Sequence, residues 1–336
     1  MLLGVLLWLA QGWAQEADGL WRQGRRAEAI EVLSAAAREA PTDKLVRRRL
    51  AEAELAVHRY AAALAHAEGL GTELDGLRGS ALYRLGEFER ALAVLGRDDV
   101  EPLLMRIDCF EALARFDEAE RDLARLLELT GARDARVAVL QGRCAARKGD
   151  TRLAESCYRR ALALDATDAA ALFGLGTLCV RSERREEGLK LLAEHRRVTP
   201  LLDKLDFARR SIDLAPAHGP NHAALGDAER ALGHIEAAEN AYRRAQELAR
   251  PDELTPIVLR HARLLAEDRR DASAAVRLLD EVHARAADVR LLVRAGDVLL
   301  ECGRREEALA RFEAALRLRP NDGEIEKRAR AARGSP

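Results

Sequence analysis

The sequence has little proline, few aromatic residues and very little lysine. Of its 336 residues nine are Pro, 4% are aromatic, and the basic residues are nearly all Arg. Because Ala, Leu, Arg and Glu dominate and favour helices, while strand-forming aromatics are scarce, the composition predicts an all-α protein. The excess of Arg over Lys is typical of a GC-rich genome, although guanidinium groups also suit the recognition of carboxylates.

Neither sign of charge is in excess. The formal net charge is −1, with 33% of the residues charged. Such a chain has no global field that would draw it toward a polyanion. We therefore expect no nucleic-acid partner.

The common motifs of catalytic and cofactor sites are missing. There is no G-x-S-x-G elbow, no G-x-x-x-x-G-K-[ST] phosphate loop and no H-E-x-x-H zinc helix. Gly174 and Gly176 come nearest to a glycine-rich loop, but they fall inside a predicted helix, where packing explains them better. His218 and His222 have the spacing of two ligands on one helix, yet a Gly-Pro step between them breaks that helix. We expect no catalytic residue, no cofactor and no metal site.

The five cysteines form no C-x-x-C pair, which argues against zinc-ribbon and thioredoxin-like chemistry. They are Cys109, Cys144, Cys157, Cys179 and Cys302. Each lies among apolar neighbours in a predicted helix, which favours the role of a small buried hydrophobe. A disulfide stays open if the chain is exported, and Cys144 with Cys157 is then the first pair to check, because they lie on the two helices of one repeat.

The chain starts with a short apolar run, Met1 to Ala10, which is too short to span a bilayer but matches a secretory h-region. Gly12-Trp13-Ala14 places small residues three and one before a cut. Residues 1–14 are therefore predicted to be a signal peptide, and the mature chain, periplasmic or secreted and without a membrane span, to begin near Gln15. No Lys or Arg precedes the run, so a cytoplasmic protein that keeps this segment as its opening helix stays open.

A helix-turn-helix unit repeats along the chain, and its clearest copy runs from residue 289 to residue 320. Gly296 and Ala308 are small where two antiparallel helices approach each other. Phe312 fills the space between the helices, and Pro320 ends the second one. Each position thus has a steric reason.

Small or apolar residues mark the same position in nine such units. The markers of the first helices are Ala17, Ala51, Gly79, Ile107, Gly142, Gly176, Gly226, Ala262 and Gly296. The markers of the second helices are Ala29, Ala63, Ala91, Ala119, Ala154, Gly188, Ala238, Ala275 and Ala308. The two markers of a unit are twelve residues apart in eight units and thirteen apart in the eighth unit. So constant a spacing is not expected by chance.

The distance between successive first-helix markers varies: 34, 28, 28, 35, 34, 50, 36 and 34 residues. The two steps of 28 predict that units two and three have second helices shortened by about two turns. The step of 50 leaves room for an irregular helical insertion at about 201–219.

This period resembles that of the tetratricopeptide repeat family, whose pattern runs W-x2-L-G-x2-Y, then A-x3-F, then P. The resemblance covers residues 15–320. It is best in the fifth unit, at Gly142, Ala154, Tyr158 and Ala161, and in the seventh, at Leu225, Gly226, Ala238, Tyr242 and Ala245. No unit has the starting Trp, and Ile107 replaces the small residue of the fourth. The resemblance implies a right-handed α-solenoid of about nine antiparallel helix pairs, with residues 321–336 as a capping helix and tail.

The resemblance also implies a site, because in this family the first helices line a groove that holds an extended peptide or a partner helix. The groove candidates are Tyr83, Arg84, Arg136, Arg143, Arg147, Phe173, Thr177 and Arg181, together with the acidic residues Glu73, Glu101, Asp108 and Glu111. The Arg residues suit carboxylates, and Phe173 would be a binding anchor if it is exposed.

The function that follows is a non-catalytic scaffold that binds a protein or peptide of unknown identity. Two other interpretations stay open. One is a docking subunit of a larger envelope enzyme, secretion or assembly complex. The other is a cytoplasmic adaptor of the same repeat family.

Overall fold

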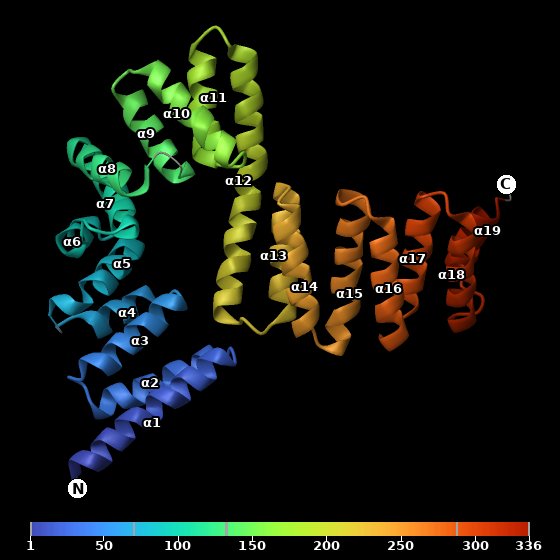
Figure 1. Ribbon diagram of the computed structural model, residues 1–336, viewed down its shortest axis with the longest axis horizontal. Helices are drawn as coiled ribbons and strands as arrows, with labels where there is room; N and C mark the ends of the chain where they lie inside the picture. The colour runs from blue at the N-terminus through green and yellow to red at the C-terminus, as the bar shows by residue number, and fades with distance from the viewer. Residues whose placement is uncertain (1, 70, 132–133, 287, 335–336) are drawn as a thin grey trace. The chain divides into compact units, whose positions relative to one another are not determined.

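The computed structural model describes residues 2–69, 71–131, 134–286 and 288–334, which form helices joined by turns and short loops (Figure 1). The helices are α1 (Leu2–Arg22), α2 (Arg26–Glu39), α3 (Lys44–Ala56), α4 (Tyr60–Ala67), α5 (Asp75–Leu85), α6 (Phe88–Val94), α7 (Val100–Ala112), α8 (Phe116–Thr130), α9 (Ala135–Arg147), α10 (Thr151–Leu164), α11 (Ala169–Arg181), α12 (Arg185–Leu214), α13 (Gly219–Leu232), α14 (Ile235–Leu248), α15 (Pro251–Arg263), α16 (Ala272–Ala286), α17 (Val289–Glu301), α18 (Arg305–Leu318) and α19 (Gly323–Arg333). The predicted all-α class is confirmed.

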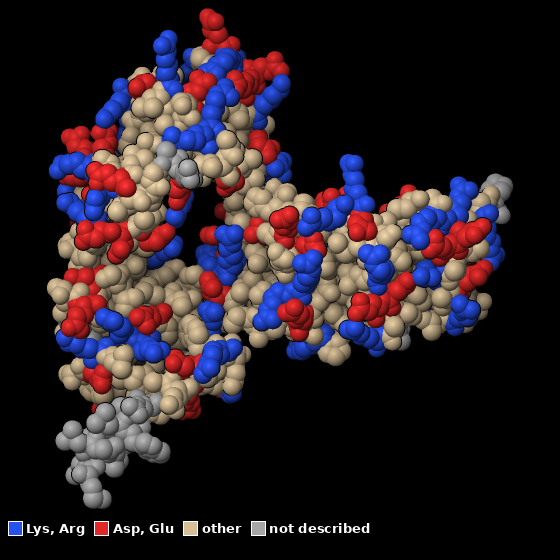
Figure 2. All heavy atoms as spheres, viewed as in Figure 1, with Lys and Arg blue, Asp and Glu red and all other residues tan. Residues whose placement is uncertain are grey.

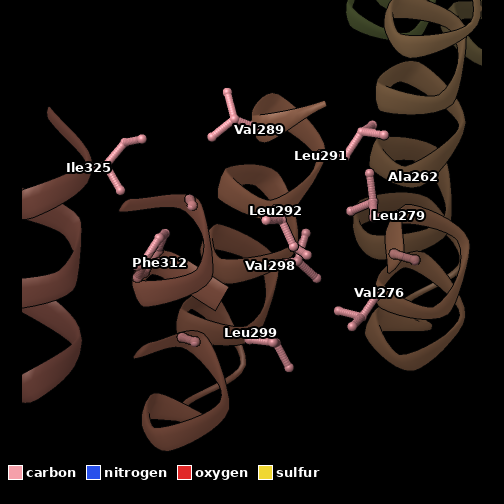
Figure 3. Packing of buried hydrophobic residues seen from close by; sticks show 14 of the residues in the cluster. Ala262, Val276, Leu279, Val289, Leu291, Leu292, Val298, Leu299, Phe312 and Ile325 are labelled. Atoms are coloured by element: carbon pink, nitrogen blue, oxygen red, sulfur yellow. The ribbon is translucent and has the colours of Figure 1, made fainter. Parts of the chain in front are cut away.

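Consecutive helices pack as nine pairs, α1 with α2 through α17 with α18, and α19 packs on the last pair. This is the predicted solenoid of about nine units with a C-terminal capping helix. The chain divides into two compact units, residues 1–200 and 201–336. Within the second unit, Figure 3 shows side chains of α15 to α19 meeting in one cluster, with Phe312 and Ile325 on its α18 and α19 side.

All eighteen predicted markers are buried in helices, and all of them except Ile107 are Gly or Ala. At Gly296, a Cβ would lie 2.5 Å from Cε1 of Phe312, so only a hydrogen fits there. The exception in the fourth unit, Ile107, is also fully buried, in a cluster that contains Leu123 of α8. Leu stands opposite glycine markers too, since a Cβ at Gly79 would meet Leu95.

The turn between the two helices of a unit explains the constant spacing of twelve residues. In seven of the nine units the backbone has a positive φ seven residues after the first-helix marker, and five of these units place Gly at that point. Two units place a residue with a Cβ there instead: His58 with φ 62° and Ala114 with φ 56°. A left-handed residue at a fixed point reverses the chain after a fixed number of residues.

We expect Ala114→Gly to stabilise the protein by about 0.5 to 1 kcal/mol, because it relieves a Cβ clash in the left-handed region. Gly149→Ala, at the same place in the next unit, should destabilise it by about 1 kcal/mol. A Cβ at Gly149 would meet nothing within 4 Å, so the effect there is conformational alone. Urea unfolding of both variants measures this, and equal stability of the two would contradict the assigned turn.

The eighth unit, with its spacing of thirteen, contains a π-helical segment. Residues Leu264–Asp268 form this segment directly after α15. A π-helical turn holds one residue more than an α-helical turn. The extra residue between Ala262 and Ala275 is therefore absorbed without displacing either marker.

The second helices of units two and three are short, as predicted. α4 has 8 residues and α6 has 7, whereas α10, α14 and α18 each have 14. At the C-terminal end of each short helix, carbonyl oxygens accept hydrogen bonds from an Arg side chain of a first helix. Arg47 of α3 donates to the carbonyl oxygens of Ala65 and His66 at 2.7 and 2.8 Å. Arg106 of α7 donates to those of Leu92 and Leu95, each at 3.2 Å. These side chains supply donors to carbonyls that a longer helix would have paired internally.

The predicted insertion at 201–219 does not form a helix of its own. α12 continues through Pro200 to Leu214, and α13 begins at Gly219 with Pro220 in its first turn. The boundary between the two compact units falls at Pro200. The domain limits proposed from the sequence remain a prediction.

The first helix extends past the predicted cleavage point, because Ala14 lies inside α1; Met1 lies outside the described residues. Trp13 and Trp21 pack against a cluster that contains Ile30 and Leu33. Cleavage after Ala14 would leave Gln15–Arg22 of this helix and remove the contact of Trp13. Within the described part of the chain we find no helix with the length and apolar character needed to cross a membrane.

The five cysteines are all present as free thiols. Four of them are buried, and Cys302 is exposed. Cys144 and Cys157 are not joined. Burial raises the pKa of the Cys109 thiol to about 11, as expected for a residue that acts as a packing group.

Candidate functional site

Neighbouring first helices touch one another within each compact unit. α5 contacts α7, α9 contacts α11, α13 contacts α15 and α15 contacts α17. We count repeat positions along a first helix from its marker, which is position 0. Residues at positions −6, −3, −2 and +1 of neighbouring first helices line shared pockets, and we call the surface that they form the first-helix face.

A pocket of about 320 Å³ opens on this surface, and we call it the α7–α9 pocket. It brings together four of the eight groove candidates: Tyr83, Arg84, Arg136 and Arg143. The apolar side chains that line it are Leu104, Met105, Val139 and Leu140. Glu101, Asp108 and Asp168 complete the lining. The sequence prediction thus identified residues that are adjacent in space, from three successive first helices.

Two of the three arginines that line the α7–α9 pocket are already paired with carboxylates. Arg136 lies 3.1 Å from a carboxylate oxygen of Glu101, and Arg143 lies 3.5 Å from Asp108. Arg143 also lies 2.7 Å from Glu111. Three arginines therefore face three carboxylates in the lining. A ligand carboxylate would have to displace these contacts.

Two polar groups of this pocket have shifted pKa values. The Tyr83 hydroxyl donates to Asp108 at 3.0 Å, and burial together with that carboxylate raises the pKa of Tyr83 to about 12. Burial also raises the pKa of Asp168, whose side chain accepts from the backbone N–H of Ala171 at the start of α11. Tyr83 therefore stays protonated and acts as a hydrogen-bond donor at neutral pH.

The other four candidates lie beside the pocket rather than in its lining. Arg147 lies 3.0 Å from Glu111, and its guanidinium stacks 4.1 Å from the ring centre of Phe116. Phe173 is 55% exposed, beside the ring of His195 at 5.4 Å, so it meets the condition set for a binding anchor. Thr177 is half-buried, and Arg181 is exposed. Phe173 occupies position −3, which in the pocket belongs to Leu104 and Val139.

A second and larger pocket, about 540 Å³, lies on α15, α17 and α19, and we call it the α15–α17 pocket. None of its residues is among the groove candidates predicted from the sequence. The arginines of its lining are Arg260, Arg263, Arg290, Arg294, Arg319 and Arg328. The carboxylates are Asp297, Asp322 and Glu324, and the apolar residues are Leu259, Val289, Val293 and Ile325. Six guanidinium groups thus face three carboxylates.

The two pockets use the same repeat positions. Position −3 is apolar in both: Leu104 and Val139 in one, Leu259 and Val293 in the other. The pockets differ most at position −2. This position holds Met105 and Leu140 in the α7–α9 pocket, but Arg260 and Arg294 in the α15–α17 pocket. Applying the same register to the eighth and ninth units would have located the second pocket from the sequence.

The histidine pair that the sequence analysis examined is engaged in local contacts. His218 lies 3.1 Å from the side-chain oxygen of Asn221, and His222 lies 2.8 Å from the carbonyl oxygen of Pro216. Among the described residues no group of three or more His, Cys, Asp or Glu has the geometry to hold a metal ion. On the face shown in Figure 2, acidic and basic side chains are interspersed.

Comparison with known families gives several matches to one family. Models described as tetratricopeptide repeat match residues 10–53, residues 104–167 and 145–199, and residues 220–252 and 289–322. The unmatched stretch between 53 and 104 contains the short helices α4 and α6. Residues 200–219 and 253–288 also lie outside these matches.

The individual proteins that the chain resembles share less than a third of their residues with it. The chain is 31% identical over 227 residues to "Cellulose synthase 2 operon protein C" of Komagataeibacter xylinus; the match covers 67% of this chain and 16% of that protein. The structure of the P58(IPK) TPR domain is 19% identical, with 96% of this chain and 97% of that chain covered and a TM-score of 0.27. YrrB, described as a TPR protein with an unusual peptide-binding site, is 20% identical, with 63% and 98% covered and a TM-score of 0.29. The chain therefore spans about a sixth of the length of the cellulose synthase operon protein.

Proposed function

We propose, from the premise that the chain belongs to the tetratricopeptide repeat family, that it is a non-catalytic scaffold whose first-helix face binds a protein or peptide. Proteins of this family bind protein or peptide partners. The observation that carries the proposal is the pair of pockets on that face, one in each compact unit, both lined by the same repeat positions. A surface that repeats apolar floor residues flanked by charged ones suits an extended segment that contacts several helices.

The groove arginines without a carboxylate partner give a direct test. Arg84 and Arg181 are both exposed at position +5 of their first helices, and within the described residues neither has an ion pair. We expect Arg84→Glu with Arg181→Glu to lower capture of the native partner by about tenfold or more, because charge is reversed at two points of the face. Quantitative co-purification with the tagged full chain measures this.

The matched control reverses two charges on the opposite face. Arg121 of α8 and Arg152 of α10 are exposed on second helices. Arg121→Glu with Arg152→Glu should leave capture within about twofold of the unaltered chain. Equal loss in both double variants would mean that net charge and not the first-helix face governs binding. Loss in the control alone would move the site to the second helices.

One observation favours a second candidate function, in which the chain is the docking subunit of a larger envelope complex. That observation is the similarity to a protein whose name refers to a cellulose synthase operon. This candidate requires export of the chain and removal of residues 1–14. Intact mass of the protein from fractionated native cells tests it: a chain that starts near Gln15 outside the cytosol supports it, and a full-length cytosolic chain overturns it.

A further inference from the structure

We propose that the α15–α17 pocket is a docking site for an acidic peptide segment that carries an apolar side chain, and that the arginines at position −2 set this preference. The inference rests on the proposed function, which it deepens by assigning one pocket a ligand class. It requires no free carboxyl terminus, because the guanidinium groups are spread over three helices and can meet side-chain carboxylates along a segment.

The lining of the α15–α17 pocket carries an excess of positive charge. The α15–α17 pocket has six arginines and three carboxylates, whereas the α7–α9 pocket has three of each. One of the three carboxylates is already committed: Asp322 accepts from the backbone N–H groups of Glu324 and Ile325 at the start of α19. An acidic segment is the complement of such a lining.

The carboxylates that pair with these guanidinium groups lie mostly outside the lining. Arg290 lies 2.6 Å from Asp288 and Arg263 lies 2.9 Å from Glu267, whereas Arg328 lies 3.2 Å from Asp297 of the lining. Arg319 is exposed and has no ion pair among the described residues. Arg294 is 22% exposed and lies at 3.5 and 3.4 Å from Glu267 and Glu301. Arg260 is 48% exposed and lies 2.8 Å from Asp227, which is outside the lining. A solvent-exposed pair such as that of Arg260 contributes about 1 kcal/mol or less, so a ligand carboxylate can replace it.

The two pockets contrast at position −2. In the α7–α9 pocket this position holds Met105 and Leu140, and Arg136 is paired with Glu101, a residue of the same pocket. Arg143 is paired as well, so Arg84 is the one guanidinium of that lining without an ion pair among the described residues. The same fold position thus gives one pocket an apolar wall and the other a cationic one.

The floor of the α15–α17 pocket is apolar. Leu259, Val293 and Ile325 line the α15–α17 pocket, and the first two occupy position −3. An apolar side chain of the ligand would bury against them while flanking carboxylates reach the arginines. Apolar contact and bidentate Arg–carboxylate pairs favour the same segment.

The experiment selects random linear peptides displayed on phage against the full chain, then measures the affinity of the most enriched peptide, made with an amidated C-terminus, by fluorescence anisotropy. We expect the selected peptides to be rich in Asp and Glu around an apolar residue. Affinity should fall by about tenfold or more in Arg260→Met with Arg294→Leu, which gives the pocket the side chains of its counterpart. Arg319→Ser should lower it as well, without any effect on folding because the side chain is exposed.

The control is Arg136→Met, at position −6 of the α7–α9 pocket, which should leave the affinity unchanged. Selected peptides without acidic preference, or acidic peptides whose affinity survives both the double variant and Arg319→Ser, would overturn this inference and leave the proposed function standing. Acidic peptides that lose affinity only through Arg136→Met would move the site to the other pocket. Selection of no peptide at all would count against the proposed function as well.

Discussion

Asp122→Ala is expected to lower the free energy of unfolding by about 3 to 5 kcal/mol, the range for removing one partner of a buried ion pair. Nε of Arg106 lies 2.7 Å from a carboxylate oxygen of Asp122, and each residue is 4% exposed. Without the carboxylate, the Arg106 guanidinium would stay buried as an uncompensated charge. The Arg106 side chain also donates to carbonyl oxygens at the end of the short helix α6, so the loss of stability should extend to the third unit.

Urea unfolding followed by circular dichroism measures this effect. The control is Glu118→Ala, which removes a partner of Arg115 from an exposed pair on the same helix and should change stability by about 1 kcal/mol or less. The double variant Arg106→Met with Asp122→Leu removes both charges and should be less harmful than Asp122→Ala alone. A loss of less than 1 kcal/mol in Asp122→Ala would contradict the role assigned to this pair.

Gly296→Leu is expected to destabilise the protein by about 1 to 3 kcal/mol through overpacking. A Cβ at this position would lie 2.5 Å from Cε1 of Phe312, which is itself fully buried. Because the atom that a Cβ at Gly296 would meet belongs to the Phe312 ring, Phe312→Leu should recover part of the stability lost in a Gly296→Ala background.

A matched substitution separates packing from helix propensity. Gly76 lies in the first helix α5, and a Cβ there would meet nothing within 4 Å. Gly76→Leu should therefore be neutral or slightly stabilising, since Leu favours helices over Gly. Thermal unfolding of the two Gly→Leu variants gives the comparison, and equal behaviour would show that the marker register is wrong.

Most of the repeat architecture could be predicted from the sequence because it follows from sterics. A position that holds Gly or Ala in every case except Ile107 recurs at a nearly constant spacing, and all eighteen residues are buried. What could not be predicted depends on tertiary packing. Pro320 ends a helix as its type suggests, but Pro200 does not, since α12 continues to Leu214. The buried pair of Arg106 and Asp122 was also missed, because charged residues are rarely buried and a pattern assigns them to the surface.

The candidate site was predicted in part. The repeat register placed Tyr83, Arg84, Arg136 and Arg143 on one surface, and they line one pocket. The register could not show that Arg136 and Arg143 pair with carboxylates of the preceding first helix, because this depends on the rotamers of long side chains. The α15–α17 pocket was missed although its signal is present in the sequence, as Arg at position −2 of two successive first helices.

The central claim, that the first-helix face binds the partner, is tested most directly by site-specific photocrosslinking in native cells. A photoreactive residue placed at Phe173 or at Arg84 probes the first helices, and one placed at Arg152 or at Arg317 probes exposed positions of second helices. The account predicts crosslinked partner at the first two positions and none at the other two. Crosslinks confined to Arg152 and Arg317 would contradict it.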